Sequence, residues 1–578
     1  MSRALCESPI AATVRTGLFF SLCAALGPCV QAQHMDGATG AEWPHYGGTQ
    51  SAWRYSALDQ INRGNVHELA PAWIFQTGED ADAFQATPIV VDGILYVSTN
   101  HGQVFAVDAA TGDPIWHYRY PPPDPNAASF ILTRPQNRGV AVSEGRVFLG
   151  TYDNHVVAID ASTGLELWKV NVDNTRQCGC LISGAPLIAE DKVIVGGTGG
   201  DGAHRGYLTA FDTATGRLAW RFYIVPGPGE PGNETWKGDS WKHGGGAAWM
   251  TGSFDPELRL VYWGTGNAAS DFYSGDRVRE GADLDGPVNL YTASVVALEV
   301  DTGELRWYYQ EIPNDVWDYD SAYEVVLFDR MVDGESRKLL LHMNKSGLTF
   351  VLDRVTGELI NVFSVAEEQT WISGFTEDGR LLGRREPREG ESINVCPSGL
   401  VGAKSWNQMA YSPRTGLIYT PTIEICMDVT ARQQEPIEGR FFAGGSASVN
   451  LPPGREMISH LDAYDPLTGE RKWTLPYRYV LVSSILATAG DLVFTGDPEG
   501  FFFALDADTG EELWRFQTGA GLRSSSVTYQ IEGRQFVAVP SGWGSVIGPM
   551  TASLFPGEGE KWRHGSALVV FALPEASH

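Results

Sequence analysis

Short apolar segments recur along the chain, and the same polar turn follows each of them. In residues 106–116, AVDAATGDPIW, the apolar stretch ends at Asp108, Thr111 and Gly112 follow, and Trp116 closes the unit. Apolar stretches of this length that are bounded by turn residues predict β-strands. Glycine adopts positive φ and short polar side chains cap backbone N–H groups, so Asp-x-x-Thr-Gly predicts a tight turn between two strands.

The spacing of this repeat predicts the fold class. Asp108, Asp160 and Asp212 follow one another at intervals of 52 residues, which suits one four-stranded unit. Six copies end in tryptophan, at Trp116, Trp168, Trp220, Trp307, Trp473 and Trp514, and a seventh has Asn361 at that place. A single sheet cannot bury both of its faces, so stacked units with a tryptophan wedged between neighbours supply the core.

We therefore predict an all-β fold, an eight-bladed β-propeller with tryptophan-docking repeats. Seven blades come from the seven copies of the repeat. The eighth is composite, because the C-terminal apolar segment 567–573 would pair with an N-terminal strand near residues 72–76 and so join the two ends of the chain.

The N-terminus has the features of an export signal. Arg3 and Arg15 precede an apolar run over residues 18–26, and small residues lead up to Ala32. The run is too short to span a bilayer. We predict a signal peptide over 1–32, a propeller domain over 33–578, a periplasmic mature protein and no integral membrane segment once the signal is removed.

The net charge restricts the class of partner. The formal charge of −28 over 578 residues argues against nucleic acid and anionic membrane surfaces as partners. An acidic surface either keeps a secreted protein soluble or attracts a basic electron-accepting protein, and both interpretations stay open. Cys396 and Cys426 can close a structural disulfide, and no Cys-x-x-Cys-His motif for covalent haem occurs.

Several longer segments together carry a resemblance to a known family. They are WPHYGGTQSAWRYSALDQINRGNVHELAPAW (43–73), WKGDSWKHGGG (236–246), YWGTGN (262–267), DVWDYD (315–320) and VVFALPE (569–575). The chain resembles the pyrroloquinoline quinone (PQQ)-dependent alcohol dehydrogenases over nearly its whole length. The resemblance implies PQQ and a metal ion, Ca²⁺ or a lanthanide, as cofactors.

The resemblance also implies roles for individual residues. Asp318 matches the catalytic base that removes the proton of the substrate hydroxyl. The metal ligands would be Asp201, Asn267, Asp318 and Asp320. The cofactor-binding residues would be Gln85, Arg138, Ser183, Gly199, Gly200, Trp249 and Lys345.

The sequence departs from the family pattern at a few of these positions. Asp201 and Gln85 stand where glutamates are usual, and Val482 replaces a common tryptophan near the substrate. Asp320 favours a lanthanide, although some calcium-using relatives carry an acid there, so the metal stays open. Leu132 and Thr133 replace an adjacent cysteine pair. We expect Cys178 and Cys180 to be buried thiols or to pair elsewhere, and a local disulfide or a functional substitute for the missing pair is the alternative.

The predicted function is that of a periplasmic PQQ- and metal-dependent dehydrogenase. It would oxidise an alcohol or polyol to the aldehyde or ketone and pass electrons to a periplasmic cytochrome c. Two alternatives remain at this point. One is a non-catalytic propeller scaffold of the outer-membrane assembly type, and the other is a degenerate family member that has lost PQQ.

Overall fold

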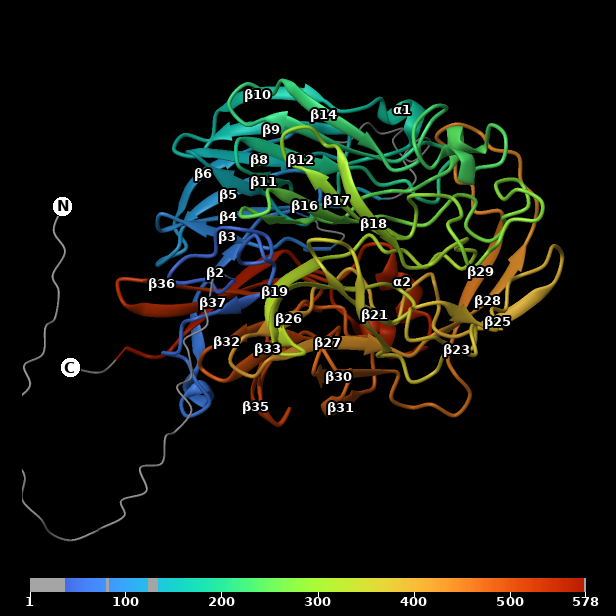
Figure 1. Ribbon diagram of the computed structural model, residues 1–578. Helices are drawn as coiled ribbons and strands as arrows, with labels where there is room; N and C mark the ends of the chain where they lie inside the picture. Colours follow the sequence, from blue (N-terminus) through green and yellow to red (C-terminus); the bar gives the residue numbers. More distant parts are fainter. Residues whose placement is uncertain (1–36, 80–82, 123–133, 576–578) are drawn as a thin grey trace, which may run out of the picture. The chain divides into compact units, whose positions relative to one another are not determined.

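The regular secondary structure consists almost entirely of short, mostly antiparallel β-sheets (Figure 1). The computed structural model describes residues 37–79, 83–122 and 134–575. The predicted signal peptide, residues 1–32, lies outside the described residues, as do Leu132 and Thr133. Among the described residues, no helix combines the length and the apolar character that crossing a membrane requires.

The described residues contain eight sheets of four or five strands. The first four in chain order are β3 (Ile89–Val91), β4 (Ile94–Ser98), β5 (Val104–Asp108) and β6 (Pro114–Tyr118); β7 (Ala141–Ser143), β8 (Arg146–Gly150), β9 (His155–Asp160) and β10 (Glu166–Asn171); β11 (Leu187–Ala189), β12 (Lys192–Gly196), β13 (Tyr207–Asp212) and β14 (Leu218–Tyr223); and β15 (Ser253–Asp255), β16 (Leu260–Gly264), β17 (Ser294–Glu299) and β18 (Leu305–Gln310).

The other four sheets include both ends of the described chain. They are β19 (Val325–Val332), β20 (Glu335–Met343), β21 (Leu348–Asp353) and β22 (Leu359–Ser364); β26 (Ala410–Ser412), β27 (Leu417–Ile423), β30 (Ser459–Tyr464) and β31 (Arg471–Tyr477); β1 (Tyr55–Ser56) with β32 (Leu486–Thr488), β33 (Leu492–Gly496), β34 (Phe501–Asp506) and β35 (Glu512–Gln517); and β2 (Ala70–Gln76) with β38 (Ala567–Ala572), β37 (Arg534–Ser541) and β36 (Val527–Ile531).

Smaller elements lie outside these sheets. Two small sheets contain β23 (Gly374–Phe375) with β24 (Leu381–Leu382), and β25 (Ser392–Val395) with β28 (Cys426–Ala431) and β29 (Gly445–Asn450). The helices are short: α1 (Thr175–Cys178), α2 (Ile547–Ala552) and 3-10 turns at Val66–Glu68, Asn233–Thr235, Ser240–His243 and Gly559–Lys561.

The repeat forms the turn between the third and fourth strands of a sheet. In the first copy, the Asp108 carboxylate accepts hydrogen bonds from the backbone N–H groups of Ala110 and Thr111. Gly112 has φ +79°, a conformation that glycine adopts without a steric penalty. The predicted tight turn is confirmed.

The repeat tryptophans contact the turn of the next sheet. Trp116 Nε1 donates to Ala161 O at 2.9 Å, and a Cβ added to Gly164 would lie 2.8 Å from the Trp116 ring. The same close approach joins Trp168 to Gly216, Trp220 to Gly303, Trp307 to Gly357 and Trp473 to Gly510. In the copy that lacks tryptophan, Asn361 donates to Leu467 O and Phe363 covers Gly469 instead.

The hydrophobic core lies between consecutive sheets. Buried residues of β4 and β5 pack against those of β8 and β9, and the series continues from each sheet to the next. The last sheet packs against the first, since Leu95 and Val97 share a cluster with Val539 and Val570. This arrangement is a β-propeller.

The two ends of the described chain meet in one sheet. Strand β2 pairs antiparallel with β38, with Trp73 opposite Val570, and Figure 1 shows the blue β2 beside the red C-terminal strands. The predicted pairing of these segments is confirmed.

Candidate active site

A cavity of about 300 Å³ gathers most of the residues that the sequence singled out. Nine of them line it: Arg138, Ser183, Gly199, Gly200, Asp201, Trp249, Asp318, Asp320 and Lys345. Gln85 and Asn267 are not lining residues, although both are fully buried.

Strand direction explains why residues so far apart in sequence meet. In an antiparallel sheet, the start of the first strand and the end of the second strand lie at the same edge. Arg138, Ser183 and Trp249 precede the first strands β7, β11 and β15, whereas Asp201 and Lys345 follow the second strands β12 and β20. Successive sheets therefore offer equivalent loops to one cavity.

Two aspartates and a lysine form the charged floor of the cavity. Lys345 Nζ lies 2.6 Å from Asp318 Oδ1 and 3.0 Å from Asp320 Oδ2. The Asp315 carboxylate fixes the turn that carries both aspartates, because it accepts hydrogen bonds from the N–H groups of Trp317 and Tyr319. Asp318 itself has φ +64°, a conformation uncommon outside glycine.

Burial and neighbouring charge shift the pKa values of these groups. Burial raises the pKa of Asp318 well above its ordinary value, and the ammonium of Lys345 opposes that shift. Burial raises the pKa of Asp201 to about 6, again against Lys345. Burial works against the charge of Lys345, but Asp318 and Asp320 more than offset it and raise the Lys345 pKa well above its ordinary value. Several ionisable groups with strongly shifted pKa values in one cavity are typical of a functional site.

The oxygen atoms beside this floor fit a hard cation. Asn267 Oδ1 is buried and accepts no hydrogen bond from any described residue. Its Nδ2 donates to Asp271 Oδ1 at 2.8 Å, and its backbone N–H donates to Asp320 Oδ1 at 2.9 Å. A Cβ at Gly200 would lie 2.6 Å from Asn267 Oδ1, so a larger residue there would displace this oxygen. Carboxylate and amide oxygens are the ligands that Ca²⁺ prefers.

Two buried arginines that line the same cavity suit it to an anion. Arg138 and Arg523 are 4% and 1% exposed, and they donate to the Gln136 side-chain oxygen and the Gly544 carbonyl rather than to a carboxylate of the described residues. Burial lowers the pKa of Arg138 to about 10, and burial together with Arg138 lowers that of Arg523 to about 9. Both guanidinium groups lie near the Trp406 ring, at 4.9 and 5.6 Å from its centroid. Unpaired buried cations beside flat rings fit a planar ligand that carries carboxylates.

Less than half of the lining residues were named from the sequence, and three of the residues that were missed bear directly on the charges and the metal ligands of the site. Arg523 and Trp406 line the cavity, and Asp271 holds the Asn267 amide. A signal for the first two exists, because Trp406 precedes β26, the first strand of its sheet, and Arg523 precedes β36, the first of the three C-terminal strands that pair with β2. That is the position that Arg138 and Trp249 occupy in theirs. Asp271 lies in an irregular loop and has no such signal.

Two other predicted positions lie outside the cavity lining. Gln85 is fully buried and neither of its amide atoms has a hydrogen-bond partner among the described residues. Val482 is fully buried in a hydrophobic cluster with Val401. Of these two, only Val401 lines the cavity, so Val482 does not border the cavity directly.

The cysteines pair in two disulfides. Cys396 and Cys426 are joined, as predicted. Cys178 and Cys180 are bonded to each other, so our expectation of buried thiols or of pairing elsewhere was wrong. Gly179 lies between them with φ +66°, which turns the chain and brings the two Cα atoms to 5.1 Å. Neither sulfur lines the cavity.

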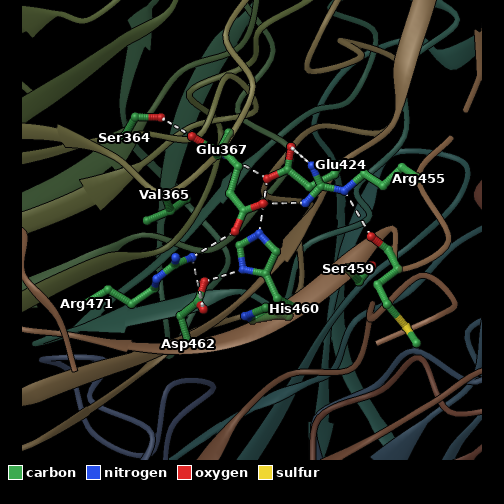
Figure 2. A network of polar contacts seen from close by, with 12 residues as sticks. Ser364, Val365, Glu367, Glu424, Arg455, Ser459, His460, Asp462 and Arg471 are labelled. Atoms are coloured by element: carbon green, nitrogen blue, oxygen red, sulfur yellow. Dashed lines mark hydrogen bonds and ion pairs between the residues drawn. The ribbon is translucent and has the colours of Figure 1, made fainter. Parts of the chain in front are cut away.

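A second polar cluster lies away from the cavity and is shown in Figure 2. We call it the His460 cluster; it comprises Glu367, Glu424, Arg455, His460, Asp462 and Arg471. His460 lies between Asp462 and Glu424, and both arginines pair with Glu367. Three carboxylates balance two guanidinium groups and one imidazolium, so the cluster is neutral without a metal ion. It joins the segment after β22 to the sheet that contains β27 and β30.

Comparisons with known proteins agree with this geometry. The family model described as PQQ, glucose/ethanol/alcohol dehydrogenase, beta-propeller domain, matches residues 43–378 and 465–537. A quinohemoprotein alcohol dehydrogenase of Comamonas testosteroni is 37% identical over 91% of this chain and 77% of its own length. The quinoprotein alcohol dehydrogenase PedH of Pseudomonas putida is 36% identical over 90% of this chain and 89% of its own.

A solved structure gives the same result. The structure of a europium-containing methanol dehydrogenase aligns with a TM-score of 0.85 and 32% identity, over 92% of this chain and 98% of the other. The chain therefore belongs to the family of PQQ-dependent alcohol dehydrogenases, a membership that implies PQQ with a calcium or lanthanide ion as its cofactors.

Proposed function

We propose that this protein oxidises an alcohol at the cavity, with Asp318 as the base that takes the hydroxyl proton. PQQ, when bound, accepts the hydride from the alcohol carbon. The observation that carries the proposal is the meeting of a buried Asp318–Lys345 pair, the unpartnered Asn267 oxygen and two unpaired arginines in one place.

In this proposal, one group of lining residues binds the metal ion and another binds the cofactor. Asp201, Asn267, Asp318 and Asp320 hold the metal ion through oxygen atoms, which balances the excess of carboxylates. Arg138 and Arg523 bind the carboxylates of the cofactor, and Trp249 supports its ring. Ser183, Gly199 and Gly200 border the same space, and Gln85 lies buried outside it.

In this proposal, Lys345 acts on the proposed base and also on the cofactor. Its ammonium opposes the rise that burial causes in the pKa of Asp318, and so favours the carboxylate form that can accept a proton from the substrate hydroxyl. With the cofactor bound, the Lys345 ammonium would also be able to donate a hydrogen bond to a quinone oxygen, and a metal ion held by Asp318 and Asp320 would balance their negative charge.

The product class and the electron path complete the proposal. The reaction yields an aldehyde or a ketone, and the electrons leave to a periplasmic cytochrome c. The supporting observations are the export-type N-terminus and the acidic charge of −28, which attracts a basic acceptor. We also propose that the eight sheets are the eight blades of a closed ring in which the repeat tryptophans dock one blade onto the next.

The alternatives from the sequence lose support. A scaffold propeller has no need for the buried charges of the cavity, and relatives about 36% identical over most of the chain are named as alcohol dehydrogenases. A degenerate member that has lost PQQ would not need to keep two unpaired buried arginines, which cost stability when no anion is bound.

The test is a dye-linked dehydrogenase assay on the purified mature protein with added PQQ. Calcium and a light lanthanide are compared in parallel against primary alcohols, polyols and sugars. We expect dye reduction that requires both PQQ and a metal ion. A folded protein that binds no PQQ with either metal would contradict the proposal.

A further inference from the structure

Glu311 is a buried carboxylate to which the proposed function assigns no role. It directly follows β18, is 1% exposed and does not line the cavity. Its Oε2 accepts hydrogen bonds from Ser321 Oγ at 2.6 Å and from Asn344 Nδ2 at 3.0 Å. Its Oε1 lies 2.7 Å from Nδ1 of His342. Ser321, Asn344 and His342 are fully buried as well, so these contacts are shielded from bulk water.

The two donors to Oε2 of Glu311 are chain neighbours of the charged floor of the cavity. Ser321 follows Asp320, and Asn344 precedes Lys345. The backbone N–H of Lys345 also donates to Asp320 O at 3.1 Å. One carboxylate oxygen therefore connects the segment that carries Asp320 to the segment that carries Lys345, and the charged groups of these two residues lie 3.0 Å apart.

Further hydrogen bonds fix each donor to its own segment. Asn344 Oδ1 accepts from the N–H and the Oγ of Ser346, at 3.0 and 2.6 Å, and so closes the turn that contains the lysine. The N–H of Ser321 donates to Thr265 O at 3.1 Å, on the segment that leads to Asn267. A shift of either donor would therefore move a segment that carries a proposed metal ligand or the lysine.

We propose that Glu311 is a positioning residue that holds Asp320 and Lys345 in the arrangement that the metal ion requires. It acts through Ser321 and Asn344 and touches no atom of the cavity lining that would bind the metal. An ionised carboxylate only accepts hydrogen bonds, so it suits a place where several donors converge. The inference rests on the proposed function, because the two segments that Glu311 connects must belong to a metal site.

The test measures metal binding after the donor and the acceptor of one contact are changed. Metal-free protein with saturating PQQ is titrated with Ca²⁺ and with La³⁺ by calorimetry. The amide of Glu311→Gln must place its NH2 group against Asn344 or His342, where an acceptor oxygen stood, and Asn344→Asp places a second carboxylate against Glu311. Each variant should raise the Kd for the metal by about 10- to 100-fold, as is usual when a group that orients metal ligands is lost.

The double variant distinguishes positioning from a general loss of structure. In Glu311→Gln/Asn344→Asp the amide can donate to the new carboxylate and to the Ser321 hydroxyl, so the contact returns with donor and acceptor exchanged. The double variant should therefore bind the metal about tenfold more tightly than either single variant. Two losses that simply add, or single variants that bind the metal like the wild type, would overturn the inference and leave the proposed function standing.

Glu424→Gln is the matched control. Glu424 is also a buried glutamate beside a histidine, since its Oε1 lies 3.1 Å from His460 Nε2, but it belongs to the His460 cluster away from the cavity. This variant should lower the thermal midpoint and leave the Kd for the metal unchanged. Should Glu311→Gln fail to fold, Ser321→Ala removes only the hydroxyl at Oε2 and should raise the same Kd by about two- to tenfold. Wild-type protein that binds neither ion would overturn both the inference and the proposed function.

Discussion

The ammonium of Lys345 lies 2.6 Å from Oδ1 of Asp318. The proposed base is therefore half of a buried ion pair, and its charge depends on a partner in a different loop, since Asp318 lies between β18 and β19 and Lys345 lies between β20 and β21. In a site of low polarity a carboxylate without this partner would bind a proton and lose its ability to accept another. The protonation state of the proposed base therefore depends on the contact between these two loops.

Replacement of the proposed base tests its role directly. Asp318→Asn should lower kcat by about 10²- to 10⁴-fold, because the amide cannot accept the hydroxyl proton. Binding of PQQ, followed by the absorbance of the bound cofactor, should change much less, since Arg138 and Arg523 remain. Full activity of the variant would place the base elsewhere.

Asp320 should decide which metal supports turnover. A trivalent ion gains more than a divalent ion from an additional carboxylate ligand, so Asp320→Ala should abolish lanthanide-supported activity and spare calcium-supported activity in part. The assay is dye reduction with each metal at saturating PQQ, with Asp320→Asn as the volume-matched control. Equal losses with the two metals, or none, would refute the argument.

Arg523 should matter for cofactor binding more than for folding. Arg523→Met removes a charge-assisted contact to the cofactor, so the Kd for PQQ should rise by about 10- to 100-fold. The thermal midpoint of the apoprotein should hold or increase, because a buried cation without a partner is removed. Arg478→Met is the control, since Arg478 is an exposed arginine paired with Glu558. A large loss of apoprotein stability with unchanged PQQ binding would contradict the assignment.

The His460 cluster predicts a loss of stability at alkaline pH. Although burial opposes it, hydrogen bonding and charge from Asp462 and Glu424 raise the pKa of His460 to about 9 from an ordinary 6.5. The raised folded-state pKa means that this stabilisation is complete below about pH 6.5 and is lost as the pH rises through about 9. The other facing groups are Glu367, Arg455, Arg471 and Tyr464.

The measurement for this cluster is the free energy of unfolding against pH. The pKa difference corresponds to about 3 kcal/mol between the two pH limits. His460→Gln should lose most of this pH dependence between pH 6.5 and 9.5 and should be less stable than the wild type at pH 6.5. Parallel pH profiles for the two proteins would show that His460 does not carry the effect.

The fold was predictable because its signals are local. Asp108, Thr111 and Gly112 specify a turn by themselves, and the tryptophan that follows lies at a fixed strand position. Where the tryptophan is missing, Phe363 covers the glycine of the next sheet in place of Asn361. The two residues are two positions apart on β22 and so share one face of the strand. The pattern at position 361 alone gave no hint of this replacement.

The site was predictable only in part. Asp318 and Lys345 stand in recognisable motifs, whereas Arg523 and Asp271 reach the site through contacts between distant segments. The spacing of residues within one segment does not show which distant segments it will contact. The Cys178–Cys180 bond forms around Gly179 in a left-handed conformation. The presence of a glycine in the sequence does not by itself predict that conformation.

The pairing of β2 with β38 sets the order in which the molecule can be completed. Strand β2 is made early and its partner almost last, so the sheet that joins the ends cannot form during synthesis. Until then Phe75 and the apolar residues around Leu95 lack the C-terminal strands that cover them. Contacts of such long sequence separation slow folding and leave apolar surface open to aggregation. A chain that lacks β38 would leave β2 and β37 without the strand that pairs with both, and the apolar surface between the first and the last sheet would stay open to chaperones and proteases.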